Sequence, residues 1–274
     1  MALPPNVSHN TQKGCNSSPD PTIIGPPMQP YPNPPIKEAL VDIRIDPLPS
    51  SMLATLEALH DQIREHYPTK KARHRWEGSV EIQEDRLISA AQRHLGRDGF
   101  LFYSQDEQQI VQYRLDGFTF NRLRPYPSLG WPVIREEAKG LWELYLRTAQ
   151  PQRIVRIGLR YINQINIPGP QVKLEDYLTE PPRVPANLPQ TLEHFITRLV
   201  IPLPTLEAKA IITQSLAPAT APDTTSLILD IDVLTEAPRP PDTASLWDVL
   251  ERFREFKNTI FKSSLTPRTE ELFG

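Results

Sequence analysis

The folded part of the chain is expected to begin at Tyr31-Pro-Asn-Pro-Pro-Ile-Lys-Glu-Ala-Leu-Val-Asp-Ile-Arg-Ile45, where a proline-rich segment changes into an alternating pattern typical of a strand. Successive side chains of a strand point to opposite faces, so Val41, Ile43 and Ile45 share one face and the residues between them share the other. The first face is apolar and the second largely polar or charged. This stretch therefore predicts a strand with one buried face.

The residues on either side of this stretch set the limits of the folded part. Residues 1–30 are rich in Pro, Asn, Ser, Thr and Gly and cannot bury enough apolar surface to offset the entropy of ordering. They are therefore expected to form a disordered tail. The remaining length is sufficient for one large domain or for two compact lobes.

Composition excludes several classes of protein. The 274 residues have a net charge of −3, so no global basic field attracts nucleic acid or an anionic membrane. Cys15 is the only cysteine, which excludes disulfide scaffolds and zinc ribbons within the chain. The start of the chain lacks the features of a secretory signal, and no apolar run approaches the ~20 residues that span a bilayer. We expect a soluble, cytoplasmic protein without membrane contact.

Periodicity predicts an α+β fold, with mainly antiparallel sheets packed against helices and room for two similar lobes. The expected units are residues 31–167 and 168–274. The expected strands are residues 39–45, 79–82, 99–104, 109–115, 117–123, 153–167, 208–216 and 226–234. The expected helices are residues 50–66, 132–148, 174–178, 190–200 and 246–261, the last with Ser245 and Asp248 as its capping box.

Three segments resemble a sporadically distributed family of uncharacterised bacterial proteins. They are residues 31–39 with the strand that follows, the strand ending in Arg160-Tyr-Ile-Asn163, and Leu229-Asp-Ile-Asp232 with the late Phe-rich helix. The similarity runs from about residue 31 to the end. The resemblance implies no catalytic residue. It implies instead a place in operons linked to defence or toxins.

Arg156, Arg160, Asp230 and Asp232 form the first candidate site. The two arginines lie on one face of their strand, and the two aspartates lie on one face of theirs. Arg binds carboxylates in a forked geometry. An ion-pair ladder on an open sheet face is the favoured interpretation. The alternative is an anion site, or a metal site in which the two aspartates supply oxygen ligands.

A basic-aromatic segment forms the second candidate site. Its cations could meet phosphates while its tryptophan stacks on a base. A solvated loop that balances acidic residues elsewhere is the favoured alternative. The residues concerned are Lys70, Lys71, Arg73, Arg75 and Trp76, together with Arg122 and Arg124.

The late helix carries more aromatic residues than one narrow stripe requires, among them Phe253, Phe256 and Phe261. Burial in the chain's own core is the favoured account. The alternative is a partner-binding or self-association face.

Sequence motifs of catalysis are absent. The chain has no Gly-x-Ser-x-Gly, His-Glu-x-x-His or Gly-x-Gly-x-x-Gly, and no cofactor or metal is expected. A non-catalytic interaction or regulatory protein, acting as a neutralising or accessory component with a protein partner or a second copy, is therefore the leading hypothesis. A nucleic-acid-binding module is second, and a metal- or anion-dependent hydrolase is third.

Overall fold

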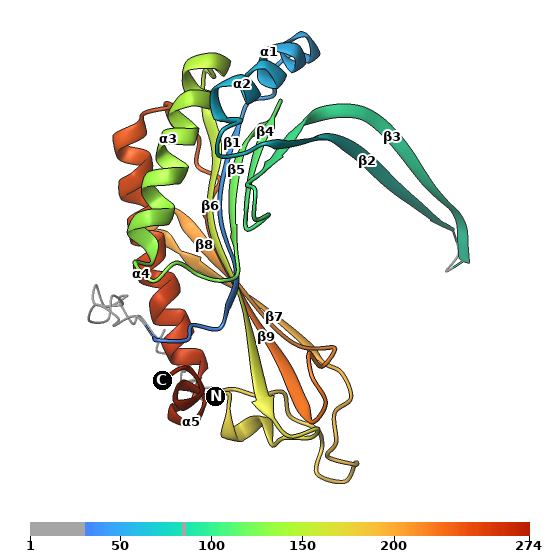
Figure 1. The fold of residues 1–274 in the computed structure, drawn as a ribbon. Coiled ribbons are helices and arrows are strands. Elements are labelled where there is room, and N and C mark those ends of the chain that lie inside the picture. The colour runs from blue at the N-terminus through green and yellow to red at the C-terminus, as the bar shows by residue number, and fades with distance from the viewer. Residues whose placement is uncertain (1–30, 84–85) are drawn as a thin grey trace, which may run out of the picture.

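The computed structural model describes residues 31–83 and 86–274, without the side chains of residues 76–95. The predicted tail, residues 1–30, lies outside this part. The described residues form one nine-stranded antiparallel sheet in the order β2-β3-β4-β5-β1-β6-β9-β8-β7 (Figure 1). The strands are β1 (Ile36–Ile45), β2 (Thr69–Gln83), β3 (Arg86–Tyr103), β4 (Gln109–Arg114), β5 (Gly117–Leu123), β6 (Ile154–Pro168), β7 (Ile196–Leu203), β8 (Ala208–Ala217) and β9 (Thr224–Thr235).

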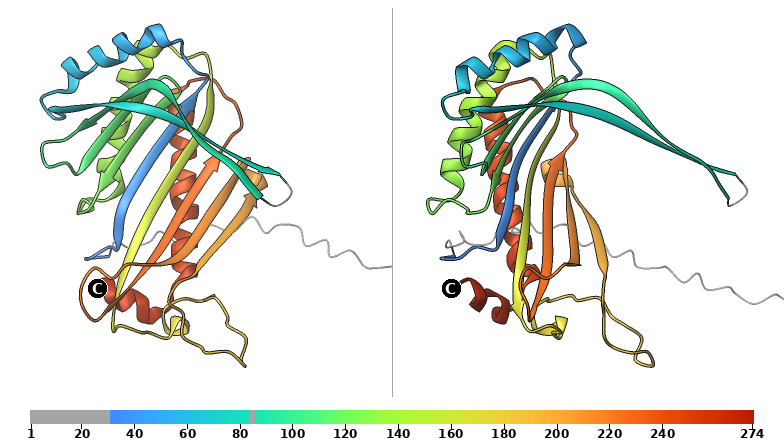
Figure 2. Two further views of the ribbon diagram at one scale, coloured as in Figure 1. Left: turned by 90° about the vertical axis from the view of Figure 1, so that its right-hand side faces the viewer. Right: turned by 45° about the vertical axis from the view of Figure 1, so that its right-hand side comes forward.

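Two long helices cover one face of the sheet, and none of the described helices lies on the other, which is called the open face below (Figures 1 and 2). The α-helices are α1 (Leu53–Ala58), α2 (His60–Ile63), α3 (Trp131–Ala149), α4 (Thr243–Ser264) and α5 (Pro267–Glu270). Short 3₁₀ turns occupy Ser50–Met52, Leu174–Asp176, Pro204–Leu206 and Glu271–Phe273. Helices α3 and α4 form the covering layer. The backbone of β2 and β3 runs beyond the sheet as a long hairpin arm on the open side.

The two halves of the chain repeat one topology. Each begins with a central strand, β1 or β6, and crosses to the edge of the sheet. Each then returns by antiparallel neighbours to pair with its own first strand, and ends in a long helix, α3 or α4. Because β1 pairs with β6, the sheet is continuous. The expectation of an α+β antiparallel fold is confirmed, but there is a single sheet where several were expected.

The alternation that predicted β1 is confirmed. Val41, Ile43 and Ile45 are buried on the helix side, and Asp42 and Arg44 face the open side. Strand β6 alternates in the same way and pairs with β1 over residues 154–163. The core lies between this sheet and the helices. Its largest fully buried side chains are Phe100, Phe102, Tyr113, Phe118, Phe120, Tyr161, Trp142, Tyr145 and Phe253.

Three predicted elements are wrong. Residues 190–200, expected as a helix, contain the start of β7, because β-branched residues such as Val200 pair with β8 at the sheet edge. Residues 70–76, expected as a basic loop, belong to β2 of the arm. Helix α4 is capped by Asp242, whose carboxylate accepts hydrogen bonds from the backbone of Ala244 and Ser245, in place of the predicted Ser245.

The tight turn between β4 and β5 depends on Gly117. Its φ is 144°, and a Cβ there would lie 2.1 Å from the carbonyl oxygen of Ile43 on β1. Gly117→Ala should therefore lower the free energy of unfolding by about 1–3 kcal/mol. Gly140→Ala is the matched control, because Gly140 lies in α3 with nothing within 4 Å of its added Cβ. That change should stabilise by up to about 1 kcal/mol. Urea denaturation checks both, and equal effects would contradict the steric argument.

Candidate functional sites: an open sheet face and a lysine pocket

An ion-pair ladder crosses the open face of the sheet. At its centre, the Asp42 carboxylate accepts hydrogen bonds from Nη2 of Arg114 at 3.0 Å and Oγ1 of Thr119 at 2.7 Å, and from Arg156. Burial pushes the pKa of Asp42 upward, but the two arginines outweigh it and hold the pKa below its usual value. Arg156 also donates to Asp232 at 3.2 Å, so the ladder extends from β4 to β9.

Arg160 and Asp230, the other two residues of the first candidate site, complete the ladder. Arg160 donates to both carboxylate oxygens of Asp230, at 2.8 and 2.5 Å, in a forked arrangement. The four residues predicted as one constellation thus come together, and each carboxylate has a guanidinium partner. Within the described part of the chain, no group of three or more His, Cys, Asp and Glu side chains is placed to hold a metal ion. The arrangement is an ion-pair ladder.

The basic-aromatic segment does not form a continuous surface. Lys70 pairs with Glu57 at 2.7 Å, and Arg73 pairs with Asp98. Lys71 lies 4.4 Å from the ring centre of Tyr103. Arg75 is exposed, and the Trp76 side chain lies outside the described residues.

The two arginines expected to extend this segment lie elsewhere. Arg122 is in register with Ala39, which faces the helices, and donates to Gln108 and to the carbonyl of Pro125. Arg124 reaches backbone carbonyls, including those of Pro35 and Ile36. It therefore ties the start of β1 to the sheet.

The aromatic residues of α4 are buried in this chain's own core. The exposed fractions of Phe253, Phe256 and Phe261 are 1%, 8% and 4%. These three residues are therefore not available as a partner-binding face, because α4 packs them against the sheet.

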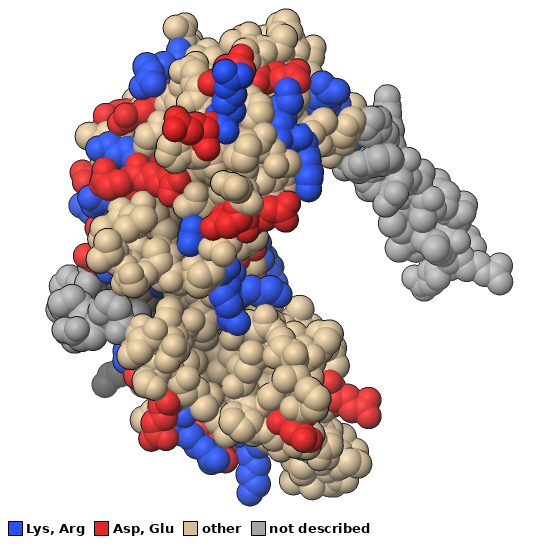
Figure 3. Space-filling view, in the orientation of Figure 1, with Lys and Arg blue, Asp and Glu red and all other residues tan. Residues whose placement is uncertain are grey.

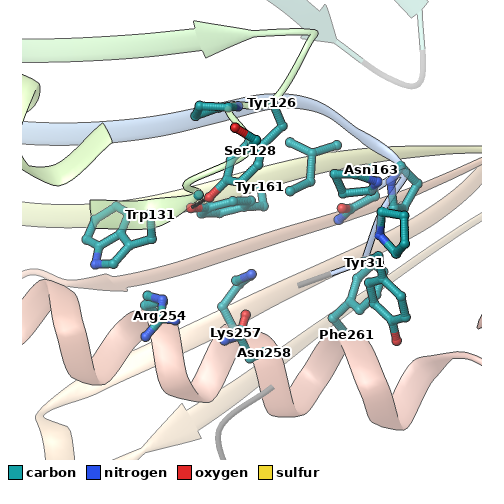
Figure 4. Close-up of a pocket in the computed structure, with 16 residues that line it drawn as sticks. Tyr31, Tyr126, Ser128, Trp131, Tyr161, Asn163, Arg254, Lys257, Asn258 and Phe261 are labelled. Atoms are coloured by element: carbon teal, nitrogen blue, oxygen red, sulfur yellow. Dashed lines mark hydrogen bonds between the residues drawn. The ribbon is translucent and has the colours of Figure 1, made fainter. Parts of the chain in front are cut away.

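A pocket of about 210 Å³ lies between α4, β6 and two connecting segments (Figure 4). The segments are residues 31–36, which lead into β1, and residues 126–131, which lead into α3. Most of the lining is aromatic, proline or aliphatic. The lining residues are Tyr31, Pro32, Pro34, Pro35, Ile36, Tyr126, Pro127, Ser128, Gly130, Trp131, Tyr161, Asn163, Arg254, Lys257, Asn258 and Phe261.

Lys257 is the buried cationic side chain of this pocket. It is 6% exposed, and its Nζ lies 4.0 Å from the ring centre of Tyr161. Among the described residues it has neither a hydrogen bond nor an ion pair. Burial, and then the nearby charge of Arg254, lower the pKa of Lys257 to about 7.

Neighbouring polar groups of the pocket are already paired. The hydroxyls of Tyr126 and Tyr161 are hydrogen-bonded at 3.0 Å. Glu251, one and a half turns before Lys257 on α4, accepts from Nε1 of Trp131 at 2.6 Å and from Arg254 at 2.7 Å. Glu251 is therefore paired elsewhere, and Lys257 has no counterion among the described residues.

Sequence reasoning missed Lys257, although a signal was present. Phe253, Lys257 and Phe261 are four residues apart, so the lysine falls in the stripe that the helix buries. The three segments quoted for the family resemblance also meet here. The first supplies Tyr31 and its prolines, the second supplies residues 161 and 163, and the third supports the wall through the carbonyl of Leu229, which accepts a hydrogen bond from Asn163 at 2.9 Å.

None of the described helices is both long and apolar enough to cross a bilayer. No protein-family model matches the chain, and no curated protein matches it in sequence.

Proposed function

We propose that this chain is a non-catalytic binding protein that holds a protein partner on the open face of its sheet. The observation that carries the proposal is the open face itself, which no helix of the described residues covers and which the β2–β3 arm flanks (Figures 1 and 2). A sheet normally buries its apolar face and leaves a polar one exposed. Here that polar face is broad and bordered by a projecting hairpin, which is the form of a docking platform.

The state of the charges favours binding over catalysis. Catalytic acids, bases and nucleophiles need side chains free to react. On this face the carboxylates of Asp42, Asp230 and Asp232 all accept from arginines. Such a network holds the surface rigid, which lowers the entropic cost of binding a partner.

The mixture of charges favours a protein over a nucleic acid. The guanidiniums of Arg114, Arg156 and Arg160 are each paired with carboxylates, so the face presents both signs. In Figure 3, where the sheet is seen edge-on, positive and negative side chains lie next to each other along the concave right-hand side. A polyanion is attracted by unbalanced positive charge, whereas a protein surface can match an alternating pattern. Ile196 and Val200 on β7 are 68% and 52% exposed and add apolar contact area to this side. A neutralising or accessory role remains a prediction.

Site-specific photo-cross-linking in cells tests this proposal. Thr213 on β8 is in register with Asp230, so it faces the open side, and replacing it with benzoylphenylalanine should trap one discrete protein. The control position is Glu136, whose side chain on α3 is 59% exposed. It should trap nothing at comparable yield.

Equal yields at the two positions would contradict the proposal. So would the absence of an adduct at Thr213, or an adduct with nucleic acid. The nucleic-acid outcome would instead support the second hypothesis, and a steep loss of binding with salt would accompany it.

A further inference from the structure

We propose that the pocket beside Lys257 binds a small organic anion, consisting of a flat apolar body and one carboxylate. The site is on the helix side of the sheet, away from the ladder and the arm. It is therefore independent of the open-face proposal, and either can fail alone.

The walls determine the body of the ligand. Tyr126, Trp131, Tyr161 and Phe261 surround the cavity, with prolines of residues 32–35 beside them (Figure 4). Aromatic and proline surfaces favour a flat apolar group, which stacks on or slides between them. The volume of about 210 Å³ suits a single ring system and is small for a nucleotide.

The charges determine its head group. The lining contains two cations, Arg254 and Lys257, and none of the described residues that line it is acidic. Arg254 is already paired with Glu251. The Lys257 ammonium lies inside the pocket over the Tyr161 ring and has no hydrogen bond or ion pair among the described residues. A buried ammonium without a counterion is costly, and a ligand carboxylate would remove that cost. The amide of Asn258 also lines the pocket as a hydrogen-bonding group, whereas that of Asn163 already donates to the carbonyl of Leu229.

Proton linkage gives the proposal a second signature. The titratable or charged groups that line the pocket with Lys257 are Tyr31 from the segment before β1, Tyr126 from the segment before α3, Tyr161 from β6 and Arg254 from α4. Glu251 on α4 is paired with Arg254. Burial, and then Arg254, lower the pKa of Lys257 to about 7, and a bound carboxylate would raise it. Binding near pH 7.5 should therefore take up protons, and affinity should fall as the pH rises above 7.

The experiment is calorimetric titration of the full chain with benzoate, phenylacetate and indole-3-acetate at pH 6.5. The controls are benzamide, which has the ring without the charge, and inorganic phosphate, which has the charge without the ring. At least one carboxylate should bind saturably and more tightly than both controls. Lys257→Met should weaken that binding at least tenfold, and Tyr161→Phe, which keeps the ring, should weaken it less.

Titration in two buffers of different ionisation enthalpy at pH 7.5 should show proton uptake with the native chain and none with Lys257→Met. Thermal unfolding of each variant checks that it is folded. The proposal is overturned if none of the three carboxylates binds saturably, if Lys257→Met binds as the native chain does, or if phosphate or benzamide binds as tightly.

Discussion

Replacing Lys257 with methionine should stabilise the ligand-free protein and remove much of its rise in stability between pH 7 and 10. The pKa of Lys257 is lowered from 10.5 to about 7, mainly by burial. Between these values the unfolded chain binds a proton that the folded chain does not. The free energy of unfolding therefore rises with pH by about 1.4 kcal/mol per unit. Over three units this is on the order of 4 kcal/mol.

The sign follows from the depressed pKa of a base. Below pH 7 Lys257 is protonated in both states, and the folded state carries the full cost of a buried ammonium. Above pH 10.5 Lys257 is neutral in both states, so that cost is absent. Met fills a similar volume without charge, so at pH 6 it should stabilise by about 1–4 kcal/mol. Urea denaturation from pH 6 to 10 measures the difference between the two proteins.

Lys262→Met is the matched control on the same helix. Hydrogen bonds with Glu270 and Tyr31 raise the pKa of Lys262, the opposite direction. The contribution of Lys262 to stability is present below the pKa that it has in the unfolded chain, and it is lost as the pH rises through the pKa that it has in the folded chain. Replacing Lys262 should therefore not stabilise the protein. If the native chain and Lys257→Met have parallel pH profiles, Lys257 is not the buried base that the structure shows.

Asp42→Asn should be the most damaging single change on the open face. It removes the charge that Arg114 and Arg156 share, and the Arg114 side chain is only 6% exposed. Removing one partner of a buried pair leaves the other charge uncompensated, so the free energy of unfolding should fall by about 3 kcal/mol. Asp116 and Asp232 remain as partners of the two arginines and limit the loss.

The pH dependence of the native protein supplies a second test of Asp42. A carboxylate with a depressed pKa stabilises above its unfolded pKa, and this contribution is lost as pH falls through the folded value. The native chain should therefore lose stability below about pH 4 more steeply than Asp42→Asn. Asp46→Asn is the control, because the side chains of Asp46 and Arg153 are 43% and 54% exposed. It should have no measurable effect, and an equally mild Asp42→Asn would show that the ladder does not stabilise the sheet.

Local pattern predicted the central elements correctly. Alternation in residues 39–45 and 153–167 identified β1 and β6, and in β1 also the buried face, because a strand imposes a two-residue period wherever it packs. The apolar spacing of residues 246–261 identified α4 in the same way. Because side chains alternate along a strand, Arg160 and Asp230 could each be assigned to one face of their strands. Their contact depended on the two strands being neighbours.

The tertiary structure alone decided how these elements are joined. Pairing of β1 with β6 makes one sheet from two similar halves, and this contact spans more than a hundred residues of chain. Residues 196–203 became the edge strand β7 because β8 lay beside them. Asp42 became the centre of the ladder because Arg156 arrives from the neighbouring strand β6 and Arg114 reaches across β5 from β4.

The lysine pocket shows the same division most clearly. The position of Lys257 in the apolar stripe of α4 is fixed by the sequence, since spacing along a helix follows from its own geometry, although the sequence analysis did not single this residue out. Whether that lysine would find a carboxylate, reach water or remain alone depended on what packed above it. The tertiary structure placed Tyr161, Tyr126 and the prolines of residues 32–35 there. Charge and spacing are local properties, whereas burial and the lack of a counterion arise only when distant segments meet.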